Sequence, residues 1–196
     1  MKEIILASQS PRRKLLLEWA EIPFKIVVQS TDESFPLHLP VEQVPIYIAK
    51  QKANAVIQFL GITNEIEPAT IVLAADTIVV LDNQVINKPA DRAEAISILS
   101  RLSGQNHRVI TGVVLKNTFK EHTFSITTHV QFHPLTIEQI EFYVDQYKPY
   151  DKAGAYAIQE WIGVVGIATI NGDFYNVMGL PVSSVVQALT LFDSSQ

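Results

Sequence analysis

Runs of Ile and Val alternate along this chain with segments whose apolar residues recur at helical spacing. Residues 2–7, 24–29 and 70–86 contain runs of the first kind, which predict buried strands. In residues 45–60 the apolar side chains lie three or four positions apart, which predicts a helix with one buried face. Because strands alternate with helices, the pattern is typical of an α/β fold.

The segment 70–86 (TIVLAADTIVVLDNQVI) carries the most polar positions of any of these runs. It predicts a strand that ends near Asp76, a second strand from Ile78, and a turn at Asp82-Asn83. Asp76 is therefore expected to project from a strand end, where α/β proteins gather their ligands.

Residues 107–116 and 122–132 predict a hairpin around Lys116-Asn117. A hairpin pairs its strands antiparallel, so the sheet is expected to be mixed rather than purely parallel. Residues 151–170 predict a loop followed by a strand. Three further helices are predicted, by their start signals: after Lys88-Pro89, after a Thr136 cap and from Pro181. The predicted fold class is thus a mixed β-sheet flanked by helices.

Length and composition limit the function classes. The chain has 196 residues, enough for one domain over 1–196, with two small lobes around a cleft as the alternative arrangement. No apolar run approaches the ~18 residues that span a bilayer, so no membrane partner is expected. A net charge of −5 disfavours binding to a nucleic-acid polymer. The lack of cysteine excludes thiolate chemistry and fits a cytoplasmic protein.

The segment SQSPRR at residues 8–13 joins the first predicted strand to a helix. Ser10 is a good N-cap, and Pro11 fits the first helical position because its missing N–H costs nothing there. A helix N-terminus carries about half a positive charge and binds phosphate readily. Arg12 and Arg13 add donor forks to that turn, so Ser8, Ser10 and Arg13 are predicted to bind phosphate. The alternative is that both arginines are solvated helix residues.

The predicted site also contains carboxylates, in addition to the phosphate-binding residues. Asp76 follows the apolar run IVLAA, and Asp32 and Glu33 leave the second predicted strand in a similar way. If Glu33 and Asp76 face the arginines, they can hold Mg²⁺ between carboxylate and phosphate oxygens, as in phosphoryl-transfer chemistry. The alternatives are that Asp76 only caps a turn and that the acidic pair at 32–33 is solvated surface.

Several other chemistries are excluded by missing motifs. The chain contains no G-x-x-x-x-G-K-[ST] and no G-x-G-x-x-G after its first strand, so it is neither a P-loop nucleotidase nor a dinucleotide-binding protein of the usual kind. It also lacks H-E-x-x-H and G-x-S-x-G, which removes the zinc proteases and the serine hydrolases. His107 is interpreted as a structural residue.

Eight motifs together resemble the Maf proteins, nucleoside triphosphate pyrophosphatases of the inosine-triphosphatase-like fold with a central cleft. They run in the family's order and at about its spacing: LASQSPRR (6–13), DES (32–34), KQKA (50–53), AADT (74–77), NKP (87–89), SGQNHRVITGV (103–113), DKAGAYAIQ (151–159) and NVMGLP (176–181). Within the family, the pattern is similar to the branch that cleaves dTTP and UTP to the monophosphate and pyrophosphate.

The resemblance implies roles for individual positions. It makes Asp76 the proton acceptor. The positions that set substrate choice are Arg12, Thr77 and Gln159. The charged positions that line the site are Arg13, Glu33, Lys52 and Lys88. It also implies a divalent cation, Mg²⁺ or Mn²⁺, a nucleoside triphosphate as substrate, and a homodimer.

Some choices stay open at this level. Asp76 fits a general base equally well as a metal ligand that lowers the pKa of water. Lys50 and Lys52 flank opposite edges of the apolar stripe in 45–60, and only the resemblance selects Lys52. The Gln159 amide can accept from N3–H of uracil or thymine and donate to a carbonyl oxygen, whereas a strand residue bonded to backbone is the alternative.

This chain departs from the family where AYGIQG is more common, because it has Ala157 and Glu160 instead of the two glycines. The departure bears on the detailed shape of the pocket. Two other functions are alternatives: a pyrophosphatase of the same family acting on 7-methylguanosine triphosphate, and a nucleotide-binding regulator of septum formation or cell division that works without turnover.

Overall fold

The computed structural model describes residues 2–63 and 67–194. Contacts divide the chain into two units, each built from separate segments. Unit 1 is made of Met1–Asp76, Thr111–Ile126 and Gly179–Gln196, and unit 2 of Thr77–Ile110 and Thr127–Met178. The prediction of one domain over 1–196, with two lobes around a cleft as its alternative, stays a prediction.

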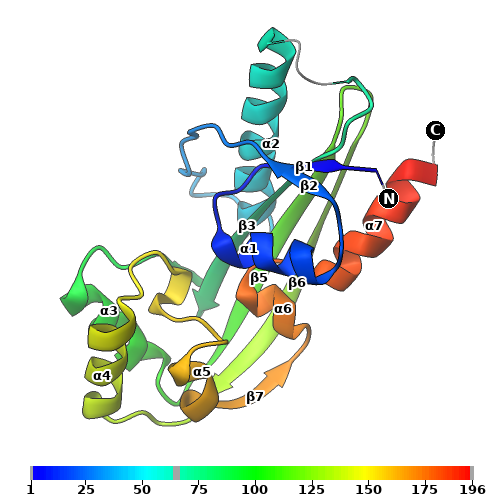
Figure 1. The fold of residues 1–196 in the computed structure, drawn as a ribbon. Helices are drawn as coiled ribbons and strands as arrows, with labels where there is room; N and C mark the ends of the chain where they lie inside the picture. The colour runs from blue at the N-terminus through cyan, green and yellow to red at the C-terminus, as the bar shows by residue number, and fades with distance from the viewer. Residues whose placement is uncertain (1, 64–66, 195–196) are drawn as a thin grey trace. The chain divides into compact units, whose positions relative to one another are not determined.

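Unit 1 holds most of the elements near the N-terminus and the last helix (Figure 1). Its elements are β1 (Ile4–Leu6), α1 (Pro11–Trp19), β2 (Phe24–Ile26), α2 (Val44–Thr63) and α7 (Val182–Ser194). Three longer strands run from one unit into the other: β3 (Val72–Leu81), β5 (Asn106–Lys116) and β6 (Glu121–Phe132). In the described part of the chain, no helix is both long and apolar enough to cross a bilayer.

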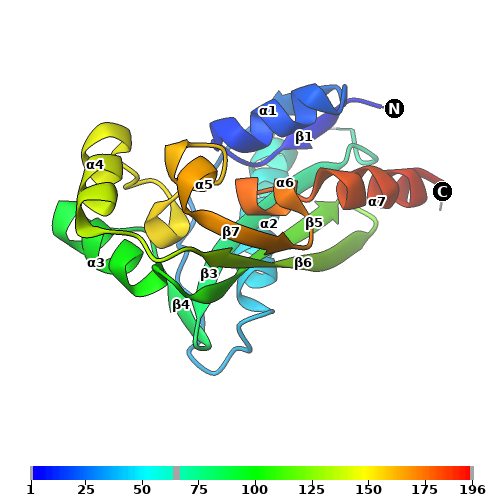
Figure 2. The same cartoon turned by 90° about the horizontal axis from the view of Figure 1, so that it is seen from below.

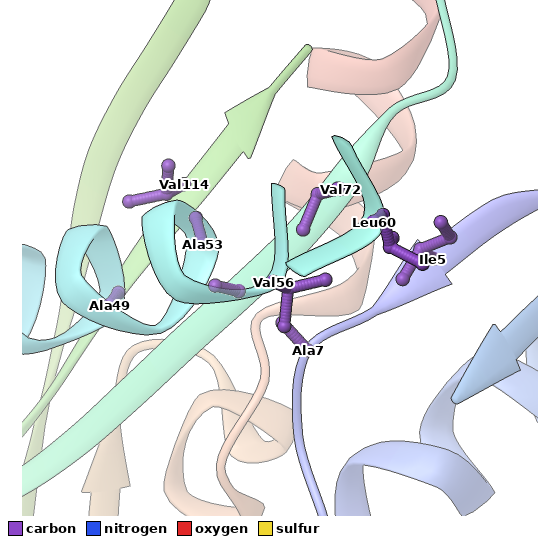
Figure 3. Close-up of a cluster of buried hydrophobic side chains, with 9 residues drawn as sticks. Ile5, Ala7, Ala49, Ala53, Val56, Leu60, Val72 and Val114 are labelled. Atoms are coloured by element: carbon purple, nitrogen blue, oxygen red, sulfur yellow. The ribbon is translucent and has the colours of Figure 1, made fainter. Parts of the chain in front are cut away.

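Helix α2 packs its apolar face on the strands of unit 1, as its spacing predicted. Ala49, Ala53 and Val56 of this helix are buried in one cluster with strand residues such as Val72 and Val114 (Figure 3). Small residues on the helix let it approach the sheet closely. The closest approach is at Gly112, where a Cβ atom would lie 2.3 Å from the Ile46 nitrogen, so only glycine fits.

The sheet is mixed, as predicted. The seven strands found among the described residues follow the order β2-β1-β3-β5-β6-β7, and β4 (Gln84–Ile86) pairs with β3. Strand β1 pairs in parallel with β2 and β3, whereas β3 pairs antiparallel with β4. In unit 2, β6 pairs antiparallel with β7 (Ile167–Asn171). The predicted mixed sheet flanked by helices is confirmed.

Strand β3 corrects one prediction. The structure has one strand, Val72–Leu81, where the sequence predicted one strand ending near Asp76 and another from Ile78. Asp76 and Thr77 are half-buried inside it, and no glycine or proline interrupts it. The predicted turn at Asp82-Asn83 is present, and both residues have positive φ, 50° and 61°.

Unit 2 contains β4, β7 and the helices between residues 92 and 178. Those helices are α3 (Arg92–Leu102), α4 (Ile137–Tyr147), η1 (Ala153–Ala155), α5 (Trp161–Gly166) and α6 (Phe174–Met178). Helices α3 and α4 lie side by side (Figure 1 and Figure 2). Arg92 of α3 donates to Asp145 of α4 over 2.6 Å, and Thr136 caps α4 in a capping box with Gln139.

A further expectation from the sequence is wrong in part. The predicted strand is present, but it begins only at Ile167, as β7, because residues 161–166 form helix α5. Gly163 lets this helix begin directly against the Ile158 carbonyl, where a Cβ would lie 1.7 Å from the oxygen. Trp161, the first residue of α5, packs with its ring edge-on to Phe142 at 4.9 Å.

His107 is a buried structural residue of unit 2, as expected. It is 1% exposed, bonds the Tyr156 hydroxyl over 2.8 Å and lies edge-on to Phe132. Burial lowers the pKa of His107 from the ordinary 6.5 to about 4. Between these values the unfolded chain binds a proton and the folded chain does not. His107 therefore does not lower the free energy of unfolding above pH 6.5. As the pH falls from 6.5 toward 4, the unfolded chain takes up this proton and the free energy of unfolding decreases.

We expect His107→Gln to flatten this pH dependence. In the parent chain, His107 accounts for a loss of about 2 kcal/mol of unfolding free energy between pH 7 and pH 5. Urea unfolding at pH 7 and at pH 5 measures this difference in unfolding free energy. His129→Gln, which removes an exposed histidine of β6, is the control and should keep the parent's slope. Equal slopes for His107→Gln and the parent would contradict the prediction.

Candidate active site

The N-terminus of α1 has the cap that the sequence predicted. The Ser10 hydroxyl accepts from the backbone N–H of Arg13 over 3.4 Å, and Pro11 occupies the first turn. Ser8 supports this turn because its Oγ accepts from the Ser10 N–H at 3.2 Å and from the Arg13 Nη1 at 3.1 Å. With its oxygen already accepting two hydrogen bonds, the Ser8 hydroxyl retains a proton to donate to an anion.

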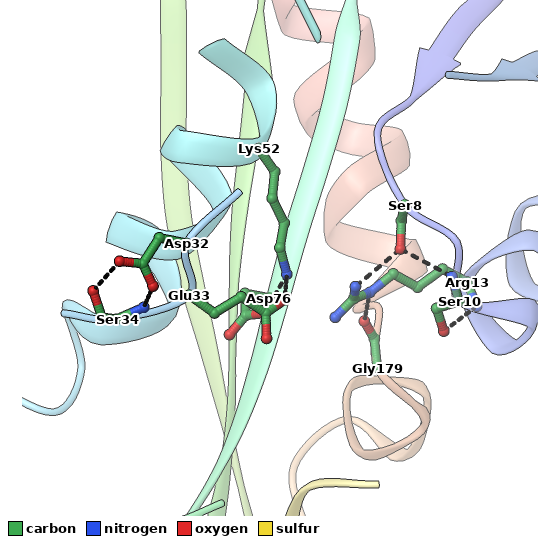
Figure 4. Close-up of polar contacts among 9 residues, drawn as sticks. All are labelled: Ser8, Ser10, Arg13, Asp32, Glu33, Ser34, Lys52, Asp76 and Gly179. Atoms are coloured by element: carbon green, nitrogen blue, oxygen red, sulfur yellow. Dashed lines mark hydrogen bonds and ion pairs between the residues drawn. The ribbon is translucent and has the colours of Figure 1, made fainter. Parts of the chain in front are cut away.

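Arg13 is a buried cation with a fixed orientation. Its Nε donates to the Gly179 carbonyl oxygen over 2.8 Å, and the residue is 8% exposed (Figure 4). Burial lowers the pKa of Arg13, nearby Asp76 raises it, Arg12 lowers it and Glu33 raises it. The two arginines and the two carboxylates are therefore close enough to interact. A desolvated guanidinium held in this way is a strong partner for phosphate oxygens.

Lys52 joins the two predicted carboxylates. Its Nζ lies 2.8 Å from Glu33 Oε1 and 2.8 Å from Asp76 Oδ1 (Figure 4). Lys50 points elsewhere and pairs with Glu121 over 2.8 Å. The tertiary structure thus separates the two lysines that helical spacing left equivalent.

The position of Asp76 differs from the sequence prediction. It lies in the interior of β3, not at a strand end, and its side chain is 13% exposed. A strand interior fixes the backbone on both sides of the residue, so the carboxylate has little freedom besides its own side-chain rotations. Thr77, the next residue of β3, is half-buried.

The acidic pair Asp32-Glu33 divides into two roles. Asp32 accepts from the backbone N–H of Ser34 at 2.8 Å and from its hydroxyl at 2.7 Å, and these bonds lower the pKa of Asp32. Its carboxylate closes a local turn of the loop. Glu33, whose side chain is 47% exposed, instead reaches Lys52. Only Glu33 is in the cluster with Asp76.

Three predicted site residues belong to unit 2 or to its part of β3. Lys88 is exposed and follows β4, and Gln159 is exposed in a turn just before α5. The alternative that Gln159 is a strand residue is wrong, because no strand includes it. The roles predicted for Lys88, Thr77 and Gln159 stay predictions.

One partner in the site was not predicted from the sequence. The Gly179 carbonyl that holds Arg13 lies 166 residues away along the chain. The signal available was the motif NVMGLP, in which a glycine stands before Leu-Pro. Gly179 has φ of 118°, a conformation that favours glycine, so this residue lets the chain turn its carbonyl toward Arg13.

The carboxylate oxygens of Glu33 and Asp76 are suitable ligands for a divalent cation. Their oxygens already converge on one cationic atom, the Lys52 nitrogen. Among the described residues, no group of three or more His, Cys, Asp and Glu side chains gathers to form a complete site. Mg²⁺ is commonly held by one or two carboxylates together with substrate phosphates and water, so two carboxylates suffice when a triphosphate is present.

Comparison with known proteins identifies the family of the chain. The model of the Maf-like protein family matches residues 3–192, nearly the whole sequence. The chain belongs to the Maf family. The resemblance predicted from the eight motifs is therefore confirmed.

Similar Maf relatives include three proteins named dTTP/UTP pyrophosphatase. The relative from Cytophaga hutchinsonii is 48% identical over 187 residues, which cover 95% of this chain and 83% of the relative. Those from Parabacteroides distasonis and Porphyromonas gingivalis are 45% and 42% identical, covering 97% and 98% of this chain and 96% of each relative. The Ham1 protein of Staphylococcus aureus matches in structure with a TM-score of 0.45 and 12% identity, over 67% of this chain and 72% of that one.

Unit 1 of this Maf chain therefore combines three chemical features. A capped helix N-terminus and Arg13 supply donors for an anion, and Lys52 supplies a second positive charge. Asp76 supplies a carboxylate on a rigid strand. This combination can bind a polyphosphate and place a base next to it.

Proposed function

We propose that this chain hydrolyses dTTP and UTP to the nucleoside monophosphate and pyrophosphate. The observation that carries the proposal is the convergence of Lys52 on Glu33 and Asp76, within electrostatic reach of buried Arg13. The identity of 42–48% to Maf relatives named dTTP/UTP pyrophosphatase supports this substrate choice.

The triphosphate is bound by the positive groups of unit 1 and by Lys88. Arg13, oriented by Ser8 and Gly179, directs its guanidinium group at phosphate oxygens. The Ser8 and Ser10 hydroxyls and the N-terminus of α1 add neutral donors. Lys52 exchanges a carboxylate for a phosphate oxygen when substrate arrives, because the phosphate replaces the negative partner that the lysine gives up.

Cleavage needs a water directed at the α phosphorus, a group that takes its proton, and positive charge on the departing pyrophosphate. Asp76 orients and deprotonates the water, while Arg13, Lys52 and Lys88 stabilise the leaving pyrophosphate. Glu33 and Asp76 would hold a divalent ion, Mg²⁺ or Mn²⁺, which would supply further positive charge for the phosphates and lower the pKa of nearby water. The alternative assignment, Asp76 as a metal ligand only, requires the same residue.

In this proposal, Arg12, Thr77 and Gln159 recognise the nucleobase of the substrate. The Gln159 amide accepts a hydrogen bond from N3–H of uracil or thymine and donates to a ring carbonyl. Cytosine has no N3–H and presents the opposite pattern at that edge. The proposal also includes a cytoplasmic location, which fits a chain without cysteine, and a homodimer, which the family resemblance implies.

A substrate panel tests the function. Purified protein is incubated with dTTP, UTP, CTP and 7-methylguanosine triphosphate, each with Mg²⁺ and with Mn²⁺, and both pyrophosphate and single phosphate are measured. We expect pyrophosphate from dTTP and UTP, about tenfold or more faster than from CTP, because a mismatched base leaves polar groups unpaired.

Each other outcome favours a different function. Release of single phosphate contradicts the proposed cleavage between the α and β phosphates. A preference for 7-methylguanosine triphosphate assigns the chain to that activity. Tight nucleotide binding with no turnover of any substrate favours the regulatory role. Gel filtration with light scattering tests the homodimer independently.

A further inference from the structure

A hydrogen-bonded cluster supports the turn that carries Gln159. Tyr143, which is completely buried in α4, accepts from the Ala157 N–H over 3.1 Å and donates its hydroxyl proton to Glu160 Oε2. One tyrosine oxygen thus bonds both ends of the turn 157–160. It fixes the turn's first residue through the backbone and its last through the side chain.

Lys152 ties the same carboxylate to the start of the loop. Its Nζ lies 3.5 Å from Glu160 Oε1 and 2.8 Å from Asp151 Oδ1, and Lys152 is 7% exposed. Glu160 stands at the N-cap position of α5, yet its side chain makes no capping hydrogen bond. The carboxylate is directed toward Tyr143 and Lys152 instead, so its role in this fold is to join α4, the loop and the start of α5.

The remaining contacts leave a single side chain of this turn exposed. The Glu160 N–H donates to the Ala157 carbonyl over 3.1 Å, which closes the turn. Ala157 and Ile158 are each 4% exposed, and Gly163 packs against the Ile158 carbonyl. Gln159 alone is exposed. The flexible Gln159 side chain is therefore attached to a backbone segment that contacts with Tyr143 and Gly163 hold in place.

We propose that Glu160, held by Tyr143 and Lys152, is a positioning residue that fixes Gln159 for reading the pyrimidine edge. This inference rests on the proposed function, in which Gln159 contacts the base. A glutamine amide discriminates between bases only if its oxygen and nitrogen reach the ring at a defined place. When the turn loosens, ordering it costs conformational entropy at each binding event, and the correct base loses its advantage.

The test compares UTP with CTP, which differ only at the edge that the Gln159 amide would contact. We expect Glu160→Ala to lower the UTP/CTP ratio of kcat/KM about tenfold, through a higher KM for UTP and with kcat within about twofold. Tyr143→Phe, which keeps the ring but removes both bonds, should lower the ratio equally. The double variant should be no worse than either single variant, because the two residues act as one unit.

Two further variants separate positioning from general stability. Glu160→Gln still accepts from the Tyr143 hydroxyl and should restore most of the ratio. Asp145→Asn, the matched control on α4, breaks the ion pair with Arg92 and should leave the ratio at the parent's value even if the melting temperature falls. If Glu160→Ala does not fold, Tyr143→Phe and Glu160→Gln decide the question.

Gln159→Ala is the reference that distinguishes two kinds of failure. If it lowers the UTP/CTP ratio and the Glu160 and Tyr143 variants do not, the positioning role is overturned while base reading by Gln159 stands. If Gln159→Ala itself leaves the ratio unchanged, base reading by Gln159 is wrong and the inference falls with it. Equal losses in Asp145→Asn and Glu160→Ala would also overturn it, since general loosening would then explain both.

Discussion

Asp76→Asn is expected to lower kcat for pyrophosphate release from dTTP at least about a hundredfold. Asparagine has nearly the same shape but accepts no proton at neutral pH and carries no charge for a cation. Because the change also removes a negative charge beside Lys52 and Arg13, binding of the anionic triphosphate should not weaken. We therefore expect the loss in kcat, with an unchanged or lower dissociation constant for dTTP.

Steady-state release of pyrophosphate gives kcat, and equilibrium binding of dTTP without divalent ion gives the dissociation constant. Glu18→Gln is the control, because it removes an exposed carboxylate of unit 1. The Glu18 carboxylate forms a long ion pair of 3.6 Å with Lys14 on the same helix. This variant should keep kcat within about twofold. A variant Asp76→Asn with parental kcat would remove Asp76 from the chemistry altogether, as base and as metal ligand.

Lys52→Met is expected to lower kcat/KM for dTTP about a hundredfold or more. Methionine keeps most of the side chain's length and apolar contacts but lacks the ammonium group. Glu33 and Asp76 then face each other without the cation that joins them, and the triphosphate loses one positive partner. Removing one partner of a partly buried ion pair also destabilises the fold, so a lower melting temperature should accompany the loss.

Lys50→Met is a closely matched control for this experiment. It makes the same chemical change on the same helix, two residues away, and removes an ion pair of the same 2.8 Å length with Glu121. Glu121 keeps Lys116 as a partner at 2.9 Å. We expect kcat/KM within about threefold of the parent. If both lysine variants lose activity equally, the site assignment of Lys52 is wrong.

The family and the phosphate-binding turn could be predicted from sequence because their signals are local or collective. Ser10, Pro11 and Arg13 lie within four residues of one another, so the cap that joins them can be recognised from spacing alone. Eight ordered motifs identified the Maf family without any knowledge of contacts. The amphipathic face of α2 was predictable for the same reason, since a helix repeats every 3.6 residues.

The continuity of β3 was not predictable in this way. A polar Asp-Thr pair inside an apolar run is consistent with a strand end and with a strand interior, because propensity is weak and neighbouring strands decide. In the structure Asp76 lies inside the strand. The rigid position of the carboxylate is thus a property of the sheet, not of the local sequence.

The sequence by itself determined the family, the α/β class with its mixed sheet, and the capped arginine turn. The family resemblance selected Lys52 over Lys50, but the tertiary structure alone decided that Lys52 pairs with Asp76, that Gly179 orients Arg13, and that Glu160 is bonded to Tyr143. Local signals depend on residues that are neighbours along the chain. These pairs are 24, 166 and 17 residues apart, so only packing of the folded chain brings them within hydrogen-bond distance.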